Sequence, residues 1–134
     1  MIKQIAVFLE NKAGKASGCC KVLKDANINL LALSLADTKE FGILRILACN
    51  EDKALKALKE AGYLASLVEL VGVEVPNRSG ALSDILILLG EHDINVEYMY
   101  SYAEDDGRAK IAFKTSTPEK AEEILKAAGV TVIA

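Results

Sequence analysis

The sequence predicts an α+β protein made of two tandem βαββαβ repeats, each with the ferredoxin-like arrangement and an antiparallel sheet. Three observations lead to this prediction. The chain matches itself when it is shifted by 66 residues, apolar β-branched runs alternate with amphipathic stretches, and turn residues recur at equivalent places in both copies. We therefore divide the 134 residues into a first repeat, 1–66, and a second repeat, 67–134, each near the lower size limit of a stable domain.

The internal match extends over most of each repeat. Identical residues coincide around the first turn, the first helix and the strand that follows, in the pairs Asn11 and Asn77, Gly14 and Gly80, Ser17 and Ser83, Leu23 and Leu89, Ile28 and Ile94, and Asn29 and Asn95. After one-residue adjustments near and beyond the hairpin, Ala61-Gly62 also coincides with Ala128-Gly129. A match of this length predicts that both copies have the same fold.

Each repeat begins with a predicted strand, a turn and a helix. Residues 4–9 and 67–75 are apolar, β-branched runs typical of strands, and a turn with Asn and Gly follows each of them. In the second repeat, apolar residues spaced three and four apart form one helical face, at Leu82, Ile85, Leu86 and Leu89. The first repeat has Ala16, Cys19, Cys20 and Leu23 at those positions.

A hairpin and a strand-terminated helix complete each repeat. The predicted hairpin strands are 28–36 with 42–48, and 94–103 with 108–114, joined by turns at 37–40 and 104–107. The predicted final elements are helices over 52–61 and 118–128 and strands over 63–66 and 130–133. Pro118 suits a first helical turn, and Gly62 and Gly129 stand where a helix C-cap glycine is expected.

The second strand of the first repeat is apolar on both faces. Strict alternation places Leu31, Leu33 and Leu35 on one face, and Leu30, Ala32 and Ala36 on the other. A strand with two apolar faces is expected to be buried on both. We therefore predict that the face without helices packs against another sheet, either in the other repeat or in a second chain of a homodimer.

Composition excludes several classes of function. The net charge is −3, and the Lys and Arg residues are scattered among acidic ones, so a nucleic-acid partner is disfavoured. The N-terminal residues show no signal-peptide pattern, and the apolar runs are far shorter than the roughly 20 residues that cross a bilayer. Three cysteines without framework spacing fit a reducing compartment. We expect a cytoplasmic protein that binds neither nucleic acid nor membrane.

Other activities of the βαββαβ frame need residues that this sequence lacks. A metallochaperone needs paired thiols in the first loop, whereas Cys19-Cys20 falls inside the helix at predicted core positions. An RNA-recognition domain needs aromatics on its central strands, and an acylphosphatase-like hydrolase needs an anion-binding loop with an Arg beside catalytic groups. His92, the single histidine, stands in a predicted turn without a catalytic partner. We therefore predict no metal, no cofactor and no catalysis.

The repeated pattern Asn-x-x-Gly, followed by Ile-Asn, is the remaining candidate for a functional site. Glycine permits a tight turn and close approach of a ligand, and the start of the following helix suits a carboxylate. The amide groups of Asn11 and Asn77 can both donate and accept hydrogen bonds. Because Asn and Gly are also ordinary turn residues, the residues alone leave open whether these loops bind a small zwitterion or only make turns.

These motifs resemble the ACT domain, and the resemblance covers essentially the whole chain. The strings Phe41-Gly42-Ile43-Leu44-Arg45 and Val96-Glu97-Tyr98-Met99-Tyr100-Ser101-Tyr102 are similar to those of small bacterial proteins that consist of two ACT domains. The resemblance implies an allosteric module that binds an amino acid or a similar small molecule between domains. Many family members have Pro before the loop glycine, where this chain has Ala13 and Ser79.

The resemblance assigns ligand contacts to the loop residues and to the Asn that opens each second strand. The candidate ligand-binding residues are Asn11, Lys12, Ala13, Gly14 and Asn29 in the first repeat, and Asn77, Arg78, Ser79, Gly80, Ala81, Leu82, Asn95, Tyr98 and Tyr100 in the second. Tyr98, Tyr100 and Tyr102 alternate along one strand and are expected on one sheet face, where they either line a ligand pocket or pack against a sheet.

We expect an amino-acid-binding sensor that has no catalytic activity and that passes its signal to a metabolic enzyme as partner. The alternative is a regulatory subunit that holds such an enzyme and whose ligand binding is vestigial.

Overall fold

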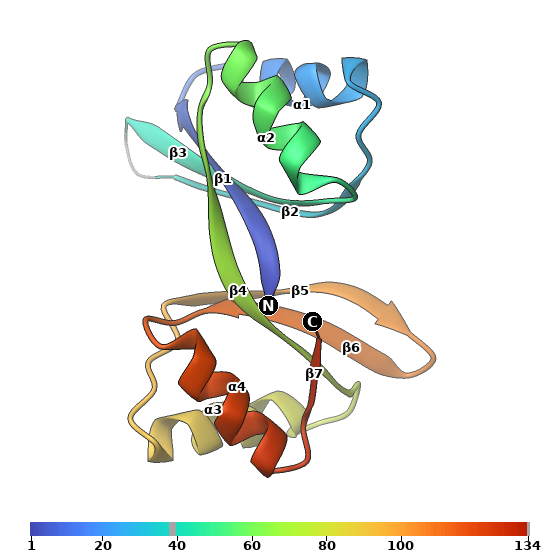
Figure 1. Ribbon diagram of the computed structural model, residues 1–134, viewed down its shortest axis with the longest axis vertical. Coiled ribbons are helices and arrows are strands. Elements are labelled where there is room, and N and C mark those ends of the chain that lie inside the picture. The colour runs from blue at the N-terminus through green and yellow to red at the C-terminus, as the bar shows by residue number, and fades with distance from the viewer. Residues whose placement is uncertain (38–39, 134) are drawn as a thin grey trace. The chain divides into compact units, whose positions relative to one another are not determined.

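The computed structural model describes residues 1–37 and 40–133 and has the βαββαβ order twice (Figure 1). Its elements are β1 (Ile2–Glu10), α1 (Lys15–Asp25), β2 (Leu30–Asp37), β3 (Phe41–Ala48), α2 (Glu51–Glu60), β4 (Leu64–Pro76), α3 (Ala81–Glu91), β5 (Tyr98–Asp105), β6 (Arg108–Lys114), α4 (Pro118–Ala127) and β7 (Thr131–Ile133). The predicted α+β class and the antiparallel sheets are confirmed. Of the turn predicted at 37–40, residues 38 and 39 lie outside the described residues.

The chain divides into two compact units, which are described separately. The N-terminal unit is Lys3–Val68, and the C-terminal unit contains Met1–Ile2 together with the chain from Glu69 onward. β4 runs through this division as one strand. The two strands predicted at 63–66 and 67–75 are therefore wrong as separate elements, because no glycine or proline interrupts the run between Leu64 and Val71.

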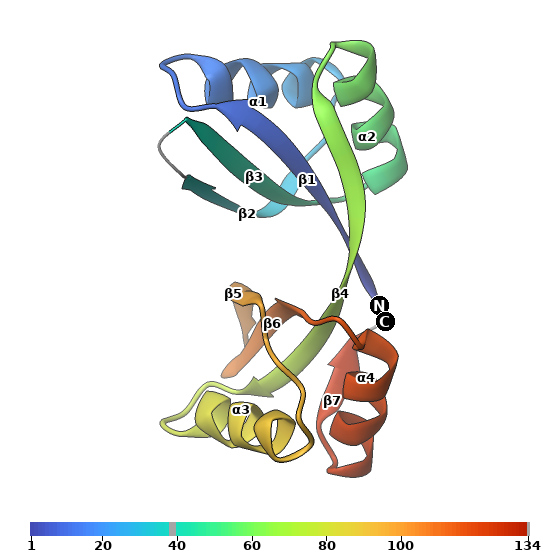
Figure 2. The same cartoon turned by 90° about the vertical axis from the view of Figure 1, so that its left-hand side faces the viewer.

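In the N-terminal unit, the strand order is β2-β3-β1 with β4 beside β1. Both helices of this unit, α1 and α2, cover the same sheet face (Figure 2). The register pairs Ile5 with Ile46 and Val7 with Leu44, so these side chains share the helix-covered face. α1 adds Cys19 and Leu23 to this core, and α2 adds Ala54 and Leu58.

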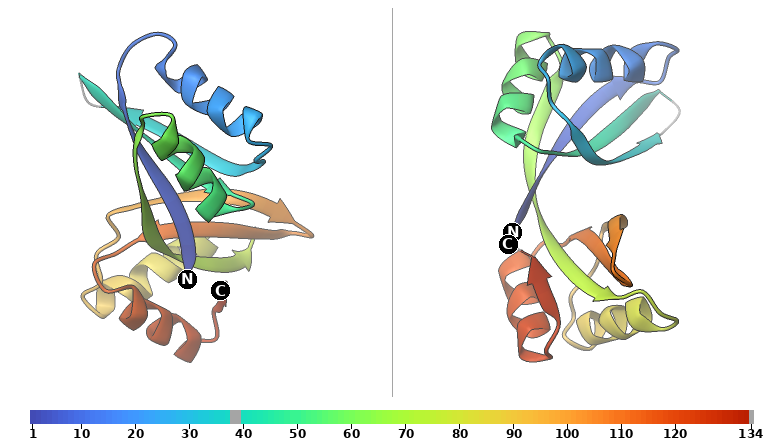
Figure 3. Two further views of the ribbon diagram at one scale, coloured as in Figure 1. Left: turned by 45° about the horizontal axis from the view of Figure 1, so that its top comes forward. Right: turned by 90° about the vertical axis from the view of Figure 1, so that its right-hand side faces the viewer.

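In the C-terminal unit, β4 pairs with both β6 and β7, and β5 pairs with β6, which gives the order β7-β4-β6-β5. α3 and α4 cover one face of this sheet (Figure 3). The core consists of strand residues in register and one residue row from each helix, at Val71, Val73, Ile111, Phe113, Ile85, Leu89, Ala121 and Leu125. The helical face predicted for α3 is only half right, because Leu82 and Leu86 are exposed while Ile85 and Leu89 are buried.

The glycines after the second helices have the predicted capping role. Gly62 follows α2 with φ 89°, and Gly129 follows α4 with φ 83°, both in the left-handed region that glycine adopts at low cost. Pro118 is at the start of α4. These local signals therefore fix where both second helices begin or end.

The second strand of the first repeat departs from the prediction. A register shift between Leu30 and Ala32 places Leu33 opposite Ile46 and Leu35 opposite Leu44, on the helix-covered side of an edge strand. Leu31, Leu33 and Leu35 nevertheless remain 53–56% exposed within the chain. The predicted alternation is confirmed from Ala32 to Ala36, but it is wrong at Leu30 and Leu31, where the register shift interrupts it. β5 likewise starts at Tyr98 instead of Ile94.

Within the described residues, none of the helices has both the length and the apolar character needed to span a membrane.

Candidate functional site

The two Asn-x-x-Gly loops have the same backbone hydrogen bonds. The Asn11 N–H donates to the Glu40 carbonyl at 2.9 Å, and the Asn77 N–H donates to the Gly107 carbonyl at 2.8 Å. Both acceptors lie at the turn between the second and third strands of their own repeat. Each loop is therefore anchored to its hairpin, and the sequence repeat is matched by a repeat of geometry.

The next bonds in the loops also match. The Lys12 N–H donates to the Glu10 carbonyl at 2.8 Å, and the Arg78 N–H donates to the Pro76 carbonyl at 2.9 Å. The first residue of each helix then donates back into its loop at 3.3 Å, from Lys15 to Lys12 and from Ala81 to Arg78. Such agreement shows that Ala13 and Ser79 are compatible with one defined loop shape.

Both loops end at a glycine that starts a helix. Gly14 has φ 86° and Gly80 has φ 87°, and each is the N-cap residue of its helix. Since glycine has no side chain, neither residue offers a side-chain acceptor to the first-turn N–H groups, as an N-cap Asn does. α2 shows the contrast, because its N-cap Asn50 accepts from the Lys53 N–H at 3.1 Å. The starts of α1 and α3 are thus suited to an anion.

The candidate loop residues are accessible to a ligand, with one exception. Asn11 to Gly14 and Asn77 to Gly80 are all exposed, and Leu82 is 39% exposed. Ala81 is 6% exposed and packs in the C-terminal core. The structure therefore places Ala81 at the base of its loop.

The candidate strand-opening residues lie away from their own loops. Asn29 and Asn95 follow the C-terminal ends of α1 and α3, while the loops precede the same helices. α1 has 11 residues, which corresponds to a length of about 16 Å at 1.5 Å per residue. Asn11 and Asn29 are consequently not brought together within one unit.

The hollow at the first loop itself is small. It has a volume of about 70 Å³ and is lined by Leu9, Glu10, Asn11, Lys12, Ala16, Leu35 and Gly42. Small-molecule sites in proteins usually have volumes of roughly 300 Å³ or more. Within the N-terminal unit, this hollow can hold part of a ligand only.

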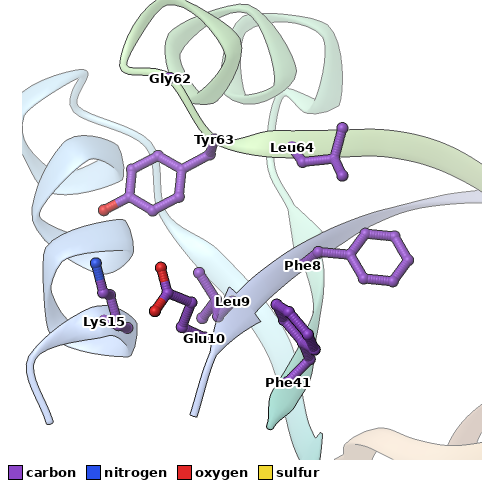
Figure 4. A pocket seen from close by; sticks show the side chains of 8 residues that line it. All are labelled: Phe8, Leu9, Glu10, Lys15, Phe41, Gly62, Tyr63 and Leu64. Atoms are coloured by element: carbon purple, nitrogen blue, oxygen red, sulfur yellow. The ribbon is translucent and has the colours of Figure 1, made fainter. Parts of the chain in front are cut away.

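A larger hollow, which we call the aromatic hollow, lies beside the start of α1 (Figure 4). Its volume is about 320 Å³, and it is lined by Phe8, Leu9, Glu10, Lys15, Phe41, Gly62, Tyr63 and Leu64. Glu10 forms an ion pair with Lys12 at 3.0 Å. The hydrogen bond and charge of Lys12, together with the charge of Lys15, lower the pKa of the Glu10 carboxyl, so it is ionised at neutral pH.

A second hollow of about 320 Å³, the charged hollow, lies at the equivalent place in the C-terminal unit. It is lined by Glu74, Val75, Pro76, Arg78, Ala81, Asp84, Ile85, Arg108, Gly129, Val130 and Thr131. Arg78 is 3.7 Å from Asp84, and Arg108 is 3.5 Å from the Glu74 carboxylate and donates to the Glu74 carbonyl. Its two arginines thus already have acidic partners.

Sequence reasoning missed most residues of the aromatic and charged hollows. Glu10 and Lys15 directly flank the first loop, so the loop motif could have indicated them. Tyr63 and Leu64 reach the aromatic hollow only because the chain returns after α2 to the edge of the sheet. That return is a property of the tertiary structure, which the local pattern does not contain.

Tyr98 and Tyr100 of β5 share the sheet face without helices, whereas a register shift between Ser101 and Ala103 interrupts the predicted alternation at Tyr102. The register places Tyr98 opposite Lys114 and Tyr100 opposite Ala112, whereas Met99 lies opposite the core residue Phe113. The predicted common face of Tyr98 and Tyr100 is therefore confirmed. Partial burial raises the pKa of the neighbouring Tyr102 hydroxyl, and the charge of Glu74 raises it further. None of these tyrosines lines the aromatic hollow or the charged hollow.

The groups rejected as metal or catalytic candidates lie in ordinary surroundings. Cys19 is buried in the N-terminal core, and burial raises the pKa of its thiol to about 11. His92 Nδ1 lies 3.0 Å from the Leu88 carbonyl at the exposed end of α3. Among the residues that the structure describes, we found no cluster of three His, Cys, Asp or Glu side chains that could hold a metal ion.

Two small α+β units whose first helices begin at equivalent glycines define a protein of two tandem ferredoxin-like domains. The chain matches the ACT domain pair family over residues 1–134. It therefore belongs to this family of regulatory domains.

Solved structures agree with this assignment. The protein BT0572 from Bacteroides thetaiotaomicron, known from a crystal structure, has 39% sequence identity to this chain and a TM-score of 0.93. The match covers 99% of this chain and 92% of that one. The regulatory subunit of aspartate kinase from Thermus thermophilus, in its ligand-free form, shares the fold at 16% identity, with 94% and 91% covered and a TM-score of 0.66. The corresponding subunit from Thermus flavus has a TM-score of 0.62 at 15% identity, with 94% and 91% covered. The search of curated proteins found no match.

Proposed function

We propose that this chain is a cytoplasmic sensor of a free amino acid or a related small acid, and that it acts on a partner without catalysing a reaction. The observation that carries the proposal is the pair of glycine-started helices. α1 and α3 begin at left-handed Gly14 and Gly80 after loops with matched hydrogen bonds. A carboxylate at these helix starts would accept hydrogen bonds from first-turn N–H groups, as the Asn50 side chain accepts one from the Lys53 N–H in α2.

The family supports a regulatory role. ACT domains bind small-molecule effectors, and two of the similar folds are regulatory subunits of aspartate kinase. Because Asn29 and Asn95 lie away from the loops of their own repeats, a complete site would need a loop from one unit and a strand-opening Asn from another. A homodimer is one way to supply that second unit.

A ligand screen tests the proposal directly. The full chain is heated with each of the common L-amino acids and their 2-oxo acids, and the melting temperature is recorded. A ligand at 100 times its dissociation constant should stabilise the protein by about 2.7 kcal/mol. If no amino acid or oxo acid raises the melting temperature at 10 mM, the sensing function is wrong.

Variants locate the site. The double variant Asn11→Ala, Asn77→Ala should bind the ligand found in the screen more weakly. It should keep its fold, because both side chains are exposed. Asn50→Ala is the matched control, since it removes the same side chain from the α2 cap. The control should lower stability by about 1 kcal/mol and leave ligand affinity unchanged. Equal effects of both changes on affinity would argue against the loops as the site.

An alternative function is that of a subunit that holds a metabolic enzyme. The exposed side chains of Leu31, Leu33 and Leu35 on an edge strand favour it, because exposed apolar residues on a sheet edge usually mark protein contacts. Co-purification of an enzyme that persists in the Asn11→Ala, Asn77→Ala variant and is lost in Leu33→Ser would support this alternative.

A further inference from the structure

The aromatic and charged hollows occupy equivalent places in the two repeats but have different linings. Each lies between the end of the first strand, the start of the first helix and the glycine turn that follows the second helix. Gly62 lines one hollow and Gly129 the other. The two repeats therefore place different side chains around the same backbone arrangement.

The aromatic hollow has a polar end and an apolar end. Figure 4 shows the Lys15 ammonium, the Glu10 carboxylate and the Tyr63 hydroxyl at one end. It shows the side chains of Phe8 and Leu64 at the other end, with the Phe41 ring below Phe8. Phe8 lies opposite Ile43, and Phe41 lies opposite Glu10, so the two rings are diagonal neighbours on one sheet face.

The polar end holds one group of each charge. Glu10 Oε2 pairs with Lys12 Nζ at 3.0 Å, and both Lys12 and Lys15 lower the pKa of the Glu10 carboxyl. The ionised carboxylate has a second oxygen that can accept a hydrogen bond from a ligand ammonium group. Lys15 is the first residue of α1, where the helix dipole also favours a ligand carboxylate. A zwitterion can therefore meet both a carboxylate and an ammonium here.

We propose that the aromatic hollow binds a free α-amino acid with an aromatic or large aliphatic side chain. Its ammonium group would contact Glu10, its carboxylate Lys15, and its side chain the rings of Phe8 and Phe41. The inference rests on the proposed sensing function and adds to it the ligand class and the residues beside the loop that select it.

The second repeat is not built for the same ligand. Tyr63 fits against α1 because position 18 is glycine, where a Cβ would come within 3.0 Å of the Tyr63 hydroxyl oxygen. The equivalent residues in the second repeat are Asp84 and Val130, and Asp84 pairs with Arg78. The charged hollow thus lacks the aromatic wall, and one apolar amino acid should bind per chain.

Isothermal titration calorimetry of the full chain tests the proposal with L-phenylalanine and L-leucine, and with L-aspartate and L-lysine as polar comparators. We expect the two apolar amino acids to bind with one site per chain and at least about tenfold more tightly than the comparators. Phenylalaninamide and N-acetylphenylalanine, which lack the carboxylate charge and the ammonium charge respectively, should each bind at least about tenfold more weakly than L-phenylalanine.

Variants then assign the contacts. Lys15→Met and Glu10→Gln should weaken binding, with Lys15→Met losing most of the preference for L-phenylalanine over its amide. Phe8→Ser should reduce the affinity for L-phenylalanine more than the affinity for L-alanine. Lys21→Met is the matched control, because Lys21 is an exposed lysine on the same helix that pairs with Asp25 at 2.9 Å. The control should leave every affinity unchanged.

Three results would overturn the proposal in distinguishable ways. Apolar amino acids that bind unchanged to Lys15→Met and Phe8→Ser but are lost in Asn11→Ala would place the ligand elsewhere and leave the sensing function standing. A Phe8→Ser change that alters the molar mass in light scattering without altering affinity would make the apolar end a protein contact. Absence of binding by every amino acid would end both the inference and the sensing function.

Discussion

The side chain of Ile2 lies directly against Gly72, so closely that a Cβ on Gly72 would overlap Ile2 Cδ1 and come within 3.0 Å of Ile2 Cγ1. The same Cβ would stand 3.2 Å from Ile133 Cβ. Gly72 is paired with Ile133 in the β4–β7 ladder and with Ala112 in the β4–β6 ladder. Because Gly72 has no side chain, there is room for Ile2 to pack against β4 in the C-terminal unit.

Gly72→Ala should therefore destabilise the protein by about 1–3 kcal/mol, because the new methyl group must displace Ile2. Denaturant unfolding measures the change. Combining Gly72→Ala with Ile2→Ala should restore part of the loss, since the second change removes the overlapping atoms. A double variant that is as unstable as the sum of both single variants would show that the two residues do not interact.

The loop glycine should respond to alanine in the opposite way from a helix glycine. Gly14→Ala should lower stability by about 1 kcal/mol, because an L-residue is strained at φ 86°. Gly90, inside α3, is the control: among the described residues, nothing lies within 4 Å of a Cβ built there. Gly90→Ala should raise stability by up to about 1 kcal/mol. Thermal melts of both variants give the comparison, and equal signs would contradict it.

Replacing Thr115 with valine should stabilise the protein. Its side-chain oxygen is buried and has no hydrogen-bond partner among the described residues. Thr115→Val keeps the shape and removes the unsatisfied group, so stability should rise by about 1 kcal/mol in urea unfolding. Thr117→Val, at the exposed N-cap position of α4, is the control and should bring no such gain. A loss of stability in Thr115→Val would mean that the hydroxyl has a partner in solution.

The buried thiol should make stability fall at high pH. Burial raises the pKa of Cys19 to about 11 from its ordinary value of 9.0. Between these values the unfolded chain releases the thiol proton while the folded chain keeps it, so the slope of stability against pH is negative there. Cys19→Val should flatten this part of the curve, measured by urea unfolding from pH 8 to 11. Cys49→Ser, at an exposed cysteine, should leave the slope unchanged.

Thiol labelling gives an independent check on the same group. At pH 7.5 a thiol reagent should modify Cys49 first, because its side chain is exposed whereas Cys19 is buried. Cys19 should react only when the protein unfolds. Rapid labelling of Cys19 in the native protein would contradict its burial.

The repeated local signals allowed the fold to be predicted. Gly14 and Gly80 marked the helix starts, and Gly62 and Gly129 marked the helix ends, because a left-handed backbone strongly favours glycine. The family resemblance was confirmed over the whole chain. Features decided by tertiary structure were not predicted: the bulge beside Leu31 and the unbroken strand through residues 66 and 67.

The candidate site was predicted less fully than the fold. The loop residues stand in one shared geometry, but their binding role stays a prediction. The pairing of Tyr63 with Gly18 could not be read from the sequence, because these residues are 45 positions apart and only the packing of α1 against the start of β4 joins them. Sequence periodicity describes faces of single elements, whereas a hollow depends on several.

The single strand formed by residues 64–76 limits how this gene could be rearranged. Cutting the coding sequence at the repeat boundary would divide β4 in its middle, so that each half would carry only part of this strand. Exchange of one copy between related genes would therefore succeed only with overlapping ends, for example one half carried through Pro76 or the other begun at Leu64.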